Sequence, residues 1–188
     1  MKEQPITMEQ TLDEKDYVAA EAALKYFSNP MSRRSVHAAM CLTGAVIAAS
    51  LVHAFQSTFS SLVWIPILLF TVFSAAAVLV WFLQPKSEAR CVRHWFRSCP
   101  LAALPTEIAI FHDRVTMESK CETITEYWTD FSICVETDDF IAAAGGRERF
   151  LFAVKKNELS EDTKKQLSAL FYSAFEGRWY RLKRKGEK

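Results

Sequence analysis

The sequence predicts an α+β membrane protein, in which a two-helix transmembrane hairpin is joined to a small antiparallel β domain closed by a C-terminal helix. Three observations favour this class. A long apolar stretch carries no Asp, Glu, Lys or Arg between Arg34 and Lys86, although about a quarter of the residues in an average soluble domain are charged. After Thr106 apolar residues recur at every second position, as in a strand, and after Ser160 they recur at helical spacing.

Residues 1–34 are predicted to form a cytoplasmic N-terminal segment with an amphipathic helix. Ile6 and Met8 alternate with polar residues, which fits a short strand. The helix begins after Asp13, which can cap it, and ends before Pro30. The start of the chain is polar and acidic, unlike a signal peptide, so the first membrane helix is expected to be an uncleaved anchor.

The charge-free stretch, residues 35–83, divides into two spans at about residues 35–55 and 62–83. At about 1.5 Å of rise per residue, each span matches a hydrocarbon core about 30 Å thick. The polar link over residues 56–61 is so short that the two helices must be antiparallel neighbours. A soluble helical pair is the alternative, but it would need a polar face that neither segment has.

The first span has a face of small residues that predicts close contact with the second. Ala38, Cys41 and Ala45 share this face, and Gly44 and Ala48 have the small-xxx-small spacing of packed membrane helices. Three consecutive alanines in the second span would allow the same close approach.

Basic residues flank the hairpin on both sides, whereas its link carries no charge. The positive-inside rule therefore predicts that both termini are cytoplasmic and that residues 56–61 lie outside. Residues 84–105 are expected to continue as a juxtamembrane basic helix, with Arg90, Arg93 and Arg97 on one stripe. This stripe either attracts anionic headgroups or is simply the flank that topology requires.

Residues 106–177 are predicted to be a cytoplasmic β-rich domain of five or six short antiparallel strands. Gly145-Gly146 is typical of a two-residue hairpin turn. Ser160 is a good N-cap for the closing helix, and Gly177 stands where a C′ glycine belongs. The layout resembles a split barrel of the pleckstrin-homology kind, or else a curved sheet under one helix.

Four residues of this domain are candidates for contacts with a partner: Trp128, Asp130, Asp138 and Asp139. A tryptophan at the end of a strand is either a core residue or an exposed anchor, and the core interpretation is favoured. The acidic residues crowd the turns and could attract a basic surface, although acidic turns are common without any function.

The tail, residues 178–188, is strongly basic, while the β domain before it is acidic. The tail can contact headgroups, fold back on the acidic domain, bind RNA or stay solvated. The residues predicted to contact lipid headgroups are Arg33, Arg34, Lys86, Arg90, Arg93, Arg97, Arg178, Trp179, Arg181, Lys183, Arg184 and Lys185.

No pattern predicts catalysis, a metal site or a cofactor. The five cysteines form no C-x-x-C pair, and no nucleophile, zincin or phosphate-loop motif occurs. His112 and Asp113 are adjacent on a strand, so they would point to opposite faces. With a net charge of +1, no nucleic-acid partner is expected.

The order of these parts resembles the YcxB-like proteins of bacteria, which have a short N-terminal segment, two adjacent membrane helices and a β-rich C-terminal domain. The local features behind the resemblance are Tyr127-Trp128-Thr129-Asp130-Phe131, Thr137-Asp138-Asp139-Phe140 and Phe152-Ala153-Val154-Lys155-Lys156. Ala153-Val154-Lys155 departs from the Ile-Pro-Lys-like step expected there. The resemblance implies a bacterial inner or plasma membrane and supplies no catalytic residue.

The predicted function is therefore a membrane-anchored cytoplasmic interaction or regulatory module without catalytic activity, with the lipid bilayer, a protein or a second copy as partner. A small subunit of a transport or immunity-type membrane complex is the alternative, because two helices alone cannot enclose a pore. An uncharacterised enzyme is the second alternative.

Overall fold

The computed structural model describes residues 5–147 and 151–182. The chain divides into two compact units. Asn29–Cys91 form the hairpin unit, and Met1–Ser28 together with Val92–Lys188 form the α/β unit. The N-terminal segment thus belongs to the same unit as the β-rich domain, whereas the sequence analysis treats the two as separate parts.

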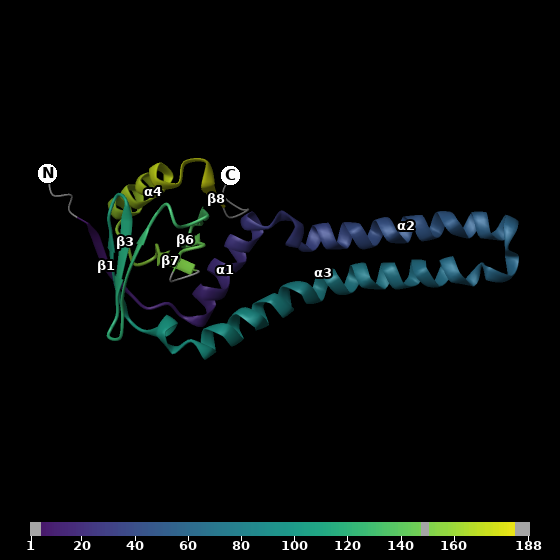
Figure 1. The fold of residues 1–188 in the computed structure, drawn as a ribbon, viewed down its shortest axis with the longest axis horizontal. Coiled ribbons are helices and arrows are strands. Elements are labelled where there is room, and N and C mark those ends of the chain that lie inside the picture. Colours follow the sequence, from purple (N-terminus) through teal and green to yellow (C-terminus); the bar gives the residue numbers. More distant parts are fainter. Residues whose placement is uncertain (1–4, 148–150, 183–188) are drawn as a thin grey trace. The chain divides into compact units, whose positions relative to one another are not determined.

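The hairpin unit consists of α2 (Arg34–Thr58) and the first part of α3 (Trp64–Ser98), which run antiparallel (Figure 1). The short 3₁₀ helix Ser60–Leu62 lies between them. Both helices are long and apolar enough to cross a membrane, which suggests a membrane protein. α3 continues through Pro85 without a break, so the second predicted span and the juxtamembrane helix are one helix.

Small residues line the contact between the two helices, as predicted. Ala38, Ala45 and Ala48 of α2 are buried, and so is Ala77 of α3. A Cβ atom added to Gly44 would lie 2.9 Å from the Phe73 ring. Glycine is therefore required here for the close approach of an aromatic ring.

Polar side chains join the same two helices at the end where the chain enters and leaves the hairpin. The Gln84 side chain donates from Nε2 to the carbonyl oxygen of Ser32 at 2.8 Å, and its Oε1 lies 3.1 Å from Nδ1 of His37. The Arg34 guanidinium lies over the Trp81 ring, 4.8 Å from its centre. A tryptophan and an arginine stacked at a helix end are typical of a membrane–water interface.

The described part of the α/β unit contains two four-stranded sheets. The first has the order β1 (Ile6–Gln10), β2 (Thr106–Ile110), β3 (Arg114–Glu118) and β4 (Thr123–Tyr127), all antiparallel. The second has the order β7 (Leu151–Lys155), β6 (Phe140–Ala144), β5 (Ile133–Glu136) and β8 (Trp179–Arg181).

Two strands come from segments that the sequence analysis placed outside the β domain. β1 pairs with β2 in the register Ile6↔Ile110 and Met8↔Ile108, so the short N-terminal strand is confirmed and becomes an edge of the first sheet. β8 comes from the basic tail and pairs with β5 in parallel. The prediction that all strands of the domain are antiparallel is therefore wrong, because β8 pairs in parallel, and the two terminal segments complete two separate sheets.

The second sheet is covered on both faces, which explains why its strands are apolar at successive positions rather than at alternate ones. On one face α1 (Glu14–Ser28) packs through Tyr17, Ala20 and Leu24. On the other face lie the first sheet and α4 (Glu161–Phe175). Strands buried on both faces carry continuous apolar runs. The α+β class and the closing C-terminal helix are confirmed, while the two sheets are not closed into a barrel.

The ends of α4 differ in how well they were predicted. The Ser160 side chain accepts a hydrogen bond from the Thr163 amide at 3.2 Å, so the predicted N-cap is confirmed. At the other end Glu176 adopts the positive φ, 39°, and Gly177 does not. The positive φ lies one residue earlier than expected, at the start of the short 3₁₀ helix Glu176–Arg178 that connects α4 with β8.

The turn between β6 and β7 is longer than the two residues predicted from Gly145-Gly146. Ala144 pairs with Leu151 and not with Arg147, as a two-residue turn at Gly145-Gly146 would require. Gly145 has a φ of 98°, and an added Cβ would lie 2.7 Å from Oγ of Ser132. Residues 148–150 lie outside the described residues.

We expect Gly145→Ala to lower the free energy of unfolding of the α/β unit by about 1–3 kcal/mol, because alanine is strained at this φ and its Cβ meets Ser132. Denaturant unfolding followed by circular dichroism measures the change. Gly177→Ala is the matched control, since nothing lies within 4 Å of its added Cβ. Equal effects for both variants would contradict the role assigned to Gly145.

Candidate functional site

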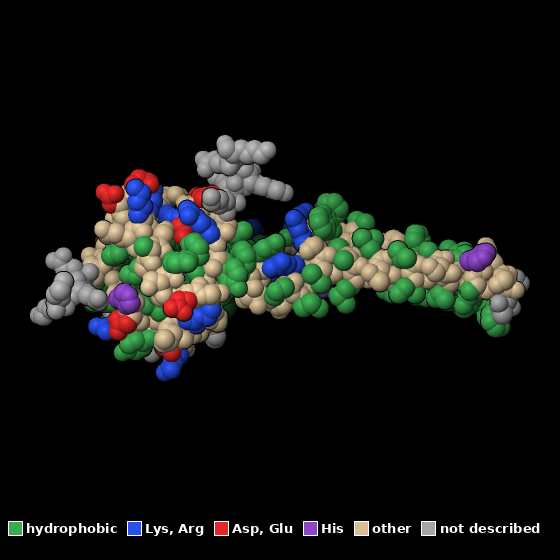
Figure 2. Space-filling view, turned by 90° about the horizontal axis from the view of Figure 1, so that it is seen from above, with side chains coloured by type: hydrophobic (Ala, Val, Ile, Leu, Met, Phe, Trp, Pro, Cys, Tyr) green, Lys and Arg blue, Asp and Glu red, His purple; other side chains and the backbone are tan. Residues whose placement is uncertain are grey.

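The hairpin unit carries most of the large apolar side chains that the described part of the chain exposes. Large apolar side chains are exposed along both helices, including Met40, Val46, Leu68, Val72 and Phe82. Figure 2 shows green side chains distributed over this unit, whereas red and blue side chains gather mainly on the α/β unit. Water disfavours so continuous an apolar surface, so it requires lipid or another apolar partner.

The basic residues on α3 that were predicted to contact headgroups separate into two groups. Arg97 donates from Nε to the Glu14 carboxylate at 2.8 Å, and Nε of Arg93 lies 3.7 Å from the same group. The hydrogen bond from Arg97 lowers the pKa of Glu14. Lys86 and Arg90 are exposed. Arg93 and Arg97 thus bind α1 through the Glu14 carboxylate, which partly neutralises their charge.

Two of the predicted headgroup residues in the tail are structural. Arg178 donates from Nη1 to the Phe131 carbonyl oxygen at 2.6 Å, and its guanidinium lies 5.5 Å from the centre of the Phe175 ring. Trp179 is half-buried against the core and stacks edge-on with Tyr172. The tail folds back on the domain at these two residues, which was one of the alternatives, and their contact with lipid stays a prediction.

Three further tail residues, Lys183, Arg184 and Lys185, lie outside the described residues. Arg181 is the last basic residue that the structure describes, and its side chain is exposed at the end of β8. Arg33 lies just before α2 and is half-buried.

Trp128 is a core residue and not an exposed anchor. Its side chain is buried, and its ring packs against those of Phe131, Phe152, Phe171 and Phe175 with centroid distances between 5.1 and 6.0 Å. The indole N–H donates to the Phe111 carbonyl oxygen at 3.0 Å. The favoured core interpretation is confirmed, and Trp128 is not available to a partner in the folded domain.

The three acidic candidates do not form one surface. Asp130 precedes β5 and pairs with Nε of Arg147 at 3.1 Å. Asp138 and Asp139 follow β5, in the turn before β6, and the Asp139 carbonyl oxygen accepts a hydrogen bond from the Lys156 amide. The length of β5 separates Asp130 from the other two, so only Asp138 and Asp139 can act together.

The sequence analysis missed a buried ionic cluster between the second sheet and α4, made of Glu136, Lys156 and Ser168. The Glu136 carboxylate accepts from Lys156 Nζ at 2.7 Å and from Ser168 Oγ at 2.8 Å. Lys156 also donates to the Thr137 carbonyl oxygen at 2.9 Å. Burial and the neighbouring Glu136 raise the pKa of the Cys134 thiol, which keeps this cysteine unreactive.

A charge at the end of the apolar run Ile133–Glu136 is the signal that could have revealed this cluster. The Glu136 and Lys156 side chains are almost fully shielded from solvent, with exposed fractions of 1% and 9%. Both charged groups of such a pair lose their hydration on folding, which costs free energy. Removing only one of them would cost more, because the other charge would stay buried without a partner. The cluster therefore fixes the position of α4 on the sheet and offers no open site for a substrate.

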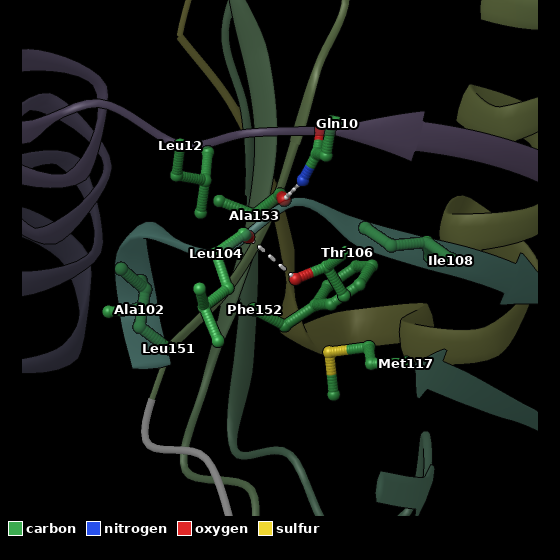
Figure 3. Close-up of a pocket in the computed structure, with 10 residues that line it drawn as sticks. All are labelled: Gln10, Leu12, Ala102, Leu104, Thr106, Ile108, Met117, Leu151, Phe152 and Ala153. Carbon is green, nitrogen blue, oxygen red and sulfur yellow. Dashed lines mark hydrogen bonds between the residues drawn. The ribbon is translucent and has the colours of Figure 1, made fainter. Parts of the chain in front are cut away.

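Gln10 is a second polar residue that the sequence analysis missed. From the end of β1 its side chain reaches across to the edge of β7, accepting from the Lys155 amide at 3.0 Å and donating to the Ala153 carbonyl oxygen. Figure 3 shows this contact beside a cavity of about 20 Å³, which is room for one water molecule. Where the two sheets meet, the Gln10 side chain thus makes the two hydrogen bonds to the backbone of β7 that a neighbouring strand would otherwise make.

We expect Gln10→Met to lower the free energy of unfolding by about 1–3 kcal/mol, because two buried backbone groups of β7 lose their partner. Denaturant unfolding of the whole chain in detergent measures the change. Glu9→Met is the control, since Glu9 is exposed on the same strand. A Gln10 variant as stable as the control variant would show that water replaces the amide without loss.

The arrangement shows no assembled metal site among the residues that the structure describes: no group of three or more His, Cys, Asp or Glu side chains could hold an ion. Asp113, beside His112, pairs instead with Arg114 at 3.1 Å. Comparisons with protein families, with curated proteins and with solved structures find no match for this chain.

Proposed function

We propose that this chain is a membrane-anchored interaction module without catalytic activity, which holds its α/β unit at the cytoplasmic face of a bacterial inner or plasma membrane. The observation that carries the proposal is the contrast between the two units. The hairpin unit exposes large apolar side chains and has no charge from Ser35 to Pro85, whereas the α/β unit buries its own core. The likeness to YcxB-like proteins supports the same proposal.

The proposed topology puts both termini in the cytoplasm and residues 56–61 outside, with the bilayer around α2 and the apolar part of α3. The basic residues at both ends of the hairpin support this orientation. A pleckstrin-homology-like layout of the α/β unit is also part of the proposal. It is supported by two four-stranded sheets that are followed by one C-terminal helix packed on them.

Cysteine labelling tests the topology directly. In cells expressing a Ser57→Cys variant, a maleimide that cannot cross membranes should label position 57 without lysis. Cys121 is exposed in the α/β unit and serves as the internal control, because it should be labelled only after lysis. Carbonate extraction of the same membranes should leave the protein in the pellet. A soluble, monodisperse chain without detergent would overturn the proposal.

The proposed interaction is with a protein partner or a second copy. Native mass in mild detergent distinguishes these: a monomer that gains mass only with a co-purifying protein supports the first, and a dimer supports the second. A homogeneous ring of many copies would overturn the module and favour a transport assembly.

A further inference from the structure

We infer that strand β8 is a replaceable strap over the edge of β5, and that the same edge binds an extended segment of a protein partner. The partner segment adds to the second sheet as a strand, in the place that Trp179–Arg181 occupy in this structure. The inference rests on the proposed interaction module and adds to it the site of the interaction and the chemistry of the bound segment.

The edge of β5 takes up a strand through its backbone. β8 is only three residues long, yet it pairs with β5 in a defined register, with Trp179 opposite Cys134 and Arg181 opposite Glu136. The Leu182 amide donates to the Glu136 carbonyl oxygen at 2.8 Å. Backbone hydrogen bonds of this kind do not depend on the side chains of the added strand. The edge is therefore open in principle to any extended segment whose side chains fit.

Two contacts select those side chains, one on each face of the sheet. Successive side chains of a strand point to opposite faces. Trp179 packs against the core on the α4 side, where its ring lies edge-on to that of Tyr172 at 5.3 Å. On the α1 side the Tyr180 ring stacks on Phe27 with a centroid distance of 4.7 Å. A bound segment should therefore carry a large apolar residue followed by an aromatic one.

The connection that leads from α4 into β8 is strained. Glu176 has a φ of 39° and a ψ of −122°, which lies outside the regions allowed to residues other than glycine. Such strain persists only where neighbouring contacts hold it, here the hydrogen bond from Arg178 to the Phe131 carbonyl oxygen. A segment of another protein has no connection to α4, so it can bind the same edge without this strain.

β8 also leaves a buried hydrogen-bond donor without a partner. The Nε1 atom of Trp179 is shielded from solvent, and none of the residues that the structure describes offers it an acceptor. Burying an unpaired N–H group costs free energy. A partner segment with phenylalanine at this position avoids that cost. The strained connection and the unpaired donor both weaken β8 in its own place, which makes it replaceable.

The test measures binding of a fluorescent peptide, Arg-Phe-Tyr-Arg-Leu, to the full chain in detergent by anisotropy. The peptide has the sequence of residues 178–182, with phenylalanine in place of Trp179. Tyr180→Pro should release the strap, because alternate amides of a strand point the same way and the Leu182 amide donates to β5. This variant should bind the peptide at least about tenfold more tightly than the wild-type chain, because the edge is no longer occupied.

Arg181→Pro is the matched control. The Arg181 amide points away from β5, so proline at this position leaves the pairing intact and the peptide affinity at the wild-type value. A second control changes the peptide. With serine in place of phenylalanine it loses the apolar contact, and it should bind the Tyr180→Pro variant at least about tenfold more weakly.

Glu176→Gly tests the strained connection separately. Glycine adopts the observed φ and ψ without strain, so β8 should open less often than in the wild-type chain. Hydrogen exchange of the Leu182 amide should slow at least about threefold, and the peptide should bind more weakly by about the same factor. Unchanged or faster exchange would show that the connection does not favour opening, and would overturn the replaceable strap.

Equal peptide affinity of Tyr180→Pro and Arg181→Pro would overturn the inference. So would loss of cooperative unfolding in Tyr180→Pro, because β8 would then be an indispensable part of the fold. A wild-type dimer that Tyr180→Pro dissociates would overturn the separate partner, since a second copy would then supply the strand. If the peptide fails but a stoichiometric protein still co-purifies with the chain, the proposed module stands and only this site is wrong.

Discussion

Replacing Lys156 with methionine is expected to lower the free energy of unfolding of the α/β unit by about 3–5 kcal/mol. The variant leaves the Glu136 carboxylate buried, with the Ser168 hydroxyl as its remaining hydrogen-bond donor among the described contacts. Methionine fills a similar volume, so the loss comes from the uncompensated charge and not from a cavity.

Cys134 provides a built-in measurement of this change. It is fully buried on β5, so a thiol reagent reaches it only when the unit opens. When closing is faster than labelling, the rate is proportional to the open fraction, and each 1.4 kcal/mol changes it about tenfold. Lys156→Met should therefore speed the labelling of Cys134 at least about a hundredfold.

The double variant Glu136→Leu with Lys156→Met is the decisive control. Removing both charges restores a neutral interior, and pairs replaced in this way are often no less stable than the original. Labelling of Cys134 should return most of the way to the wild-type rate. A double variant as unstable as Lys156→Met alone would show that the lysine acts through packing and not through its charge.

Trp128→Ala is expected to lower the free energy of unfolding by about 3–5 kcal/mol, the range measured for large aromatic side chains truncated in a core. The indole fills the space among four phenylalanines from β7, α4 and the turn after β4. Its removal leaves a cavity and deprives the Phe111 carbonyl oxygen of its donor. Denaturant unfolding in detergent measures the loss.

Trp128→Phe separates the two contributions, because it keeps most of the apolar volume and removes only the N–H donor. Its cost should be about 1–2 kcal/mol. Tyr127→Ala is the surface control and should change stability by less than about 0.5 kcal/mol, since half of the Tyr127 side chain is exposed. If Trp128→Ala abolished the binding of a protein partner without lowering the free energy of unfolding, Trp128 would be a binding residue and not a core residue.

The sequence predicted those features that depend on neighbours a few residues away. The charge-free stretch with its small residues indicated two packed apolar helices, and Ala38, Ala45 and Ala48 are buried as expected. Ser160 caps α4 through its own third neighbour. The preference of a strand-end tryptophan for the core was also sufficient to place Trp128 correctly.

The sequence did not predict which distant segments complete the sheets. β1 and β8 are short, and their partners are far along the chain, so local periodicity carries no information about the pairing of Ile6 with Ile110 or of Tyr180 with Val135. The same holds for the turn at Gly145, where the pairing of Ala144 with Leu151 overrides a local two-residue turn signal.

The buried cluster of Glu136, Lys156 and Ser168 shows most clearly where prediction from the sequence ends. By itself the sequence determined that the central stretch is apolar, that α1 and α4 are amphipathic helices and that the region just before α4 is rich in strands. Only the tertiary structure decided that Glu136, Lys156 and Ser168 meet. The free-energy cost of burying a charge is offset by partners that lie on other elements. Hydrophobic periodicity along one element cannot identify those partners.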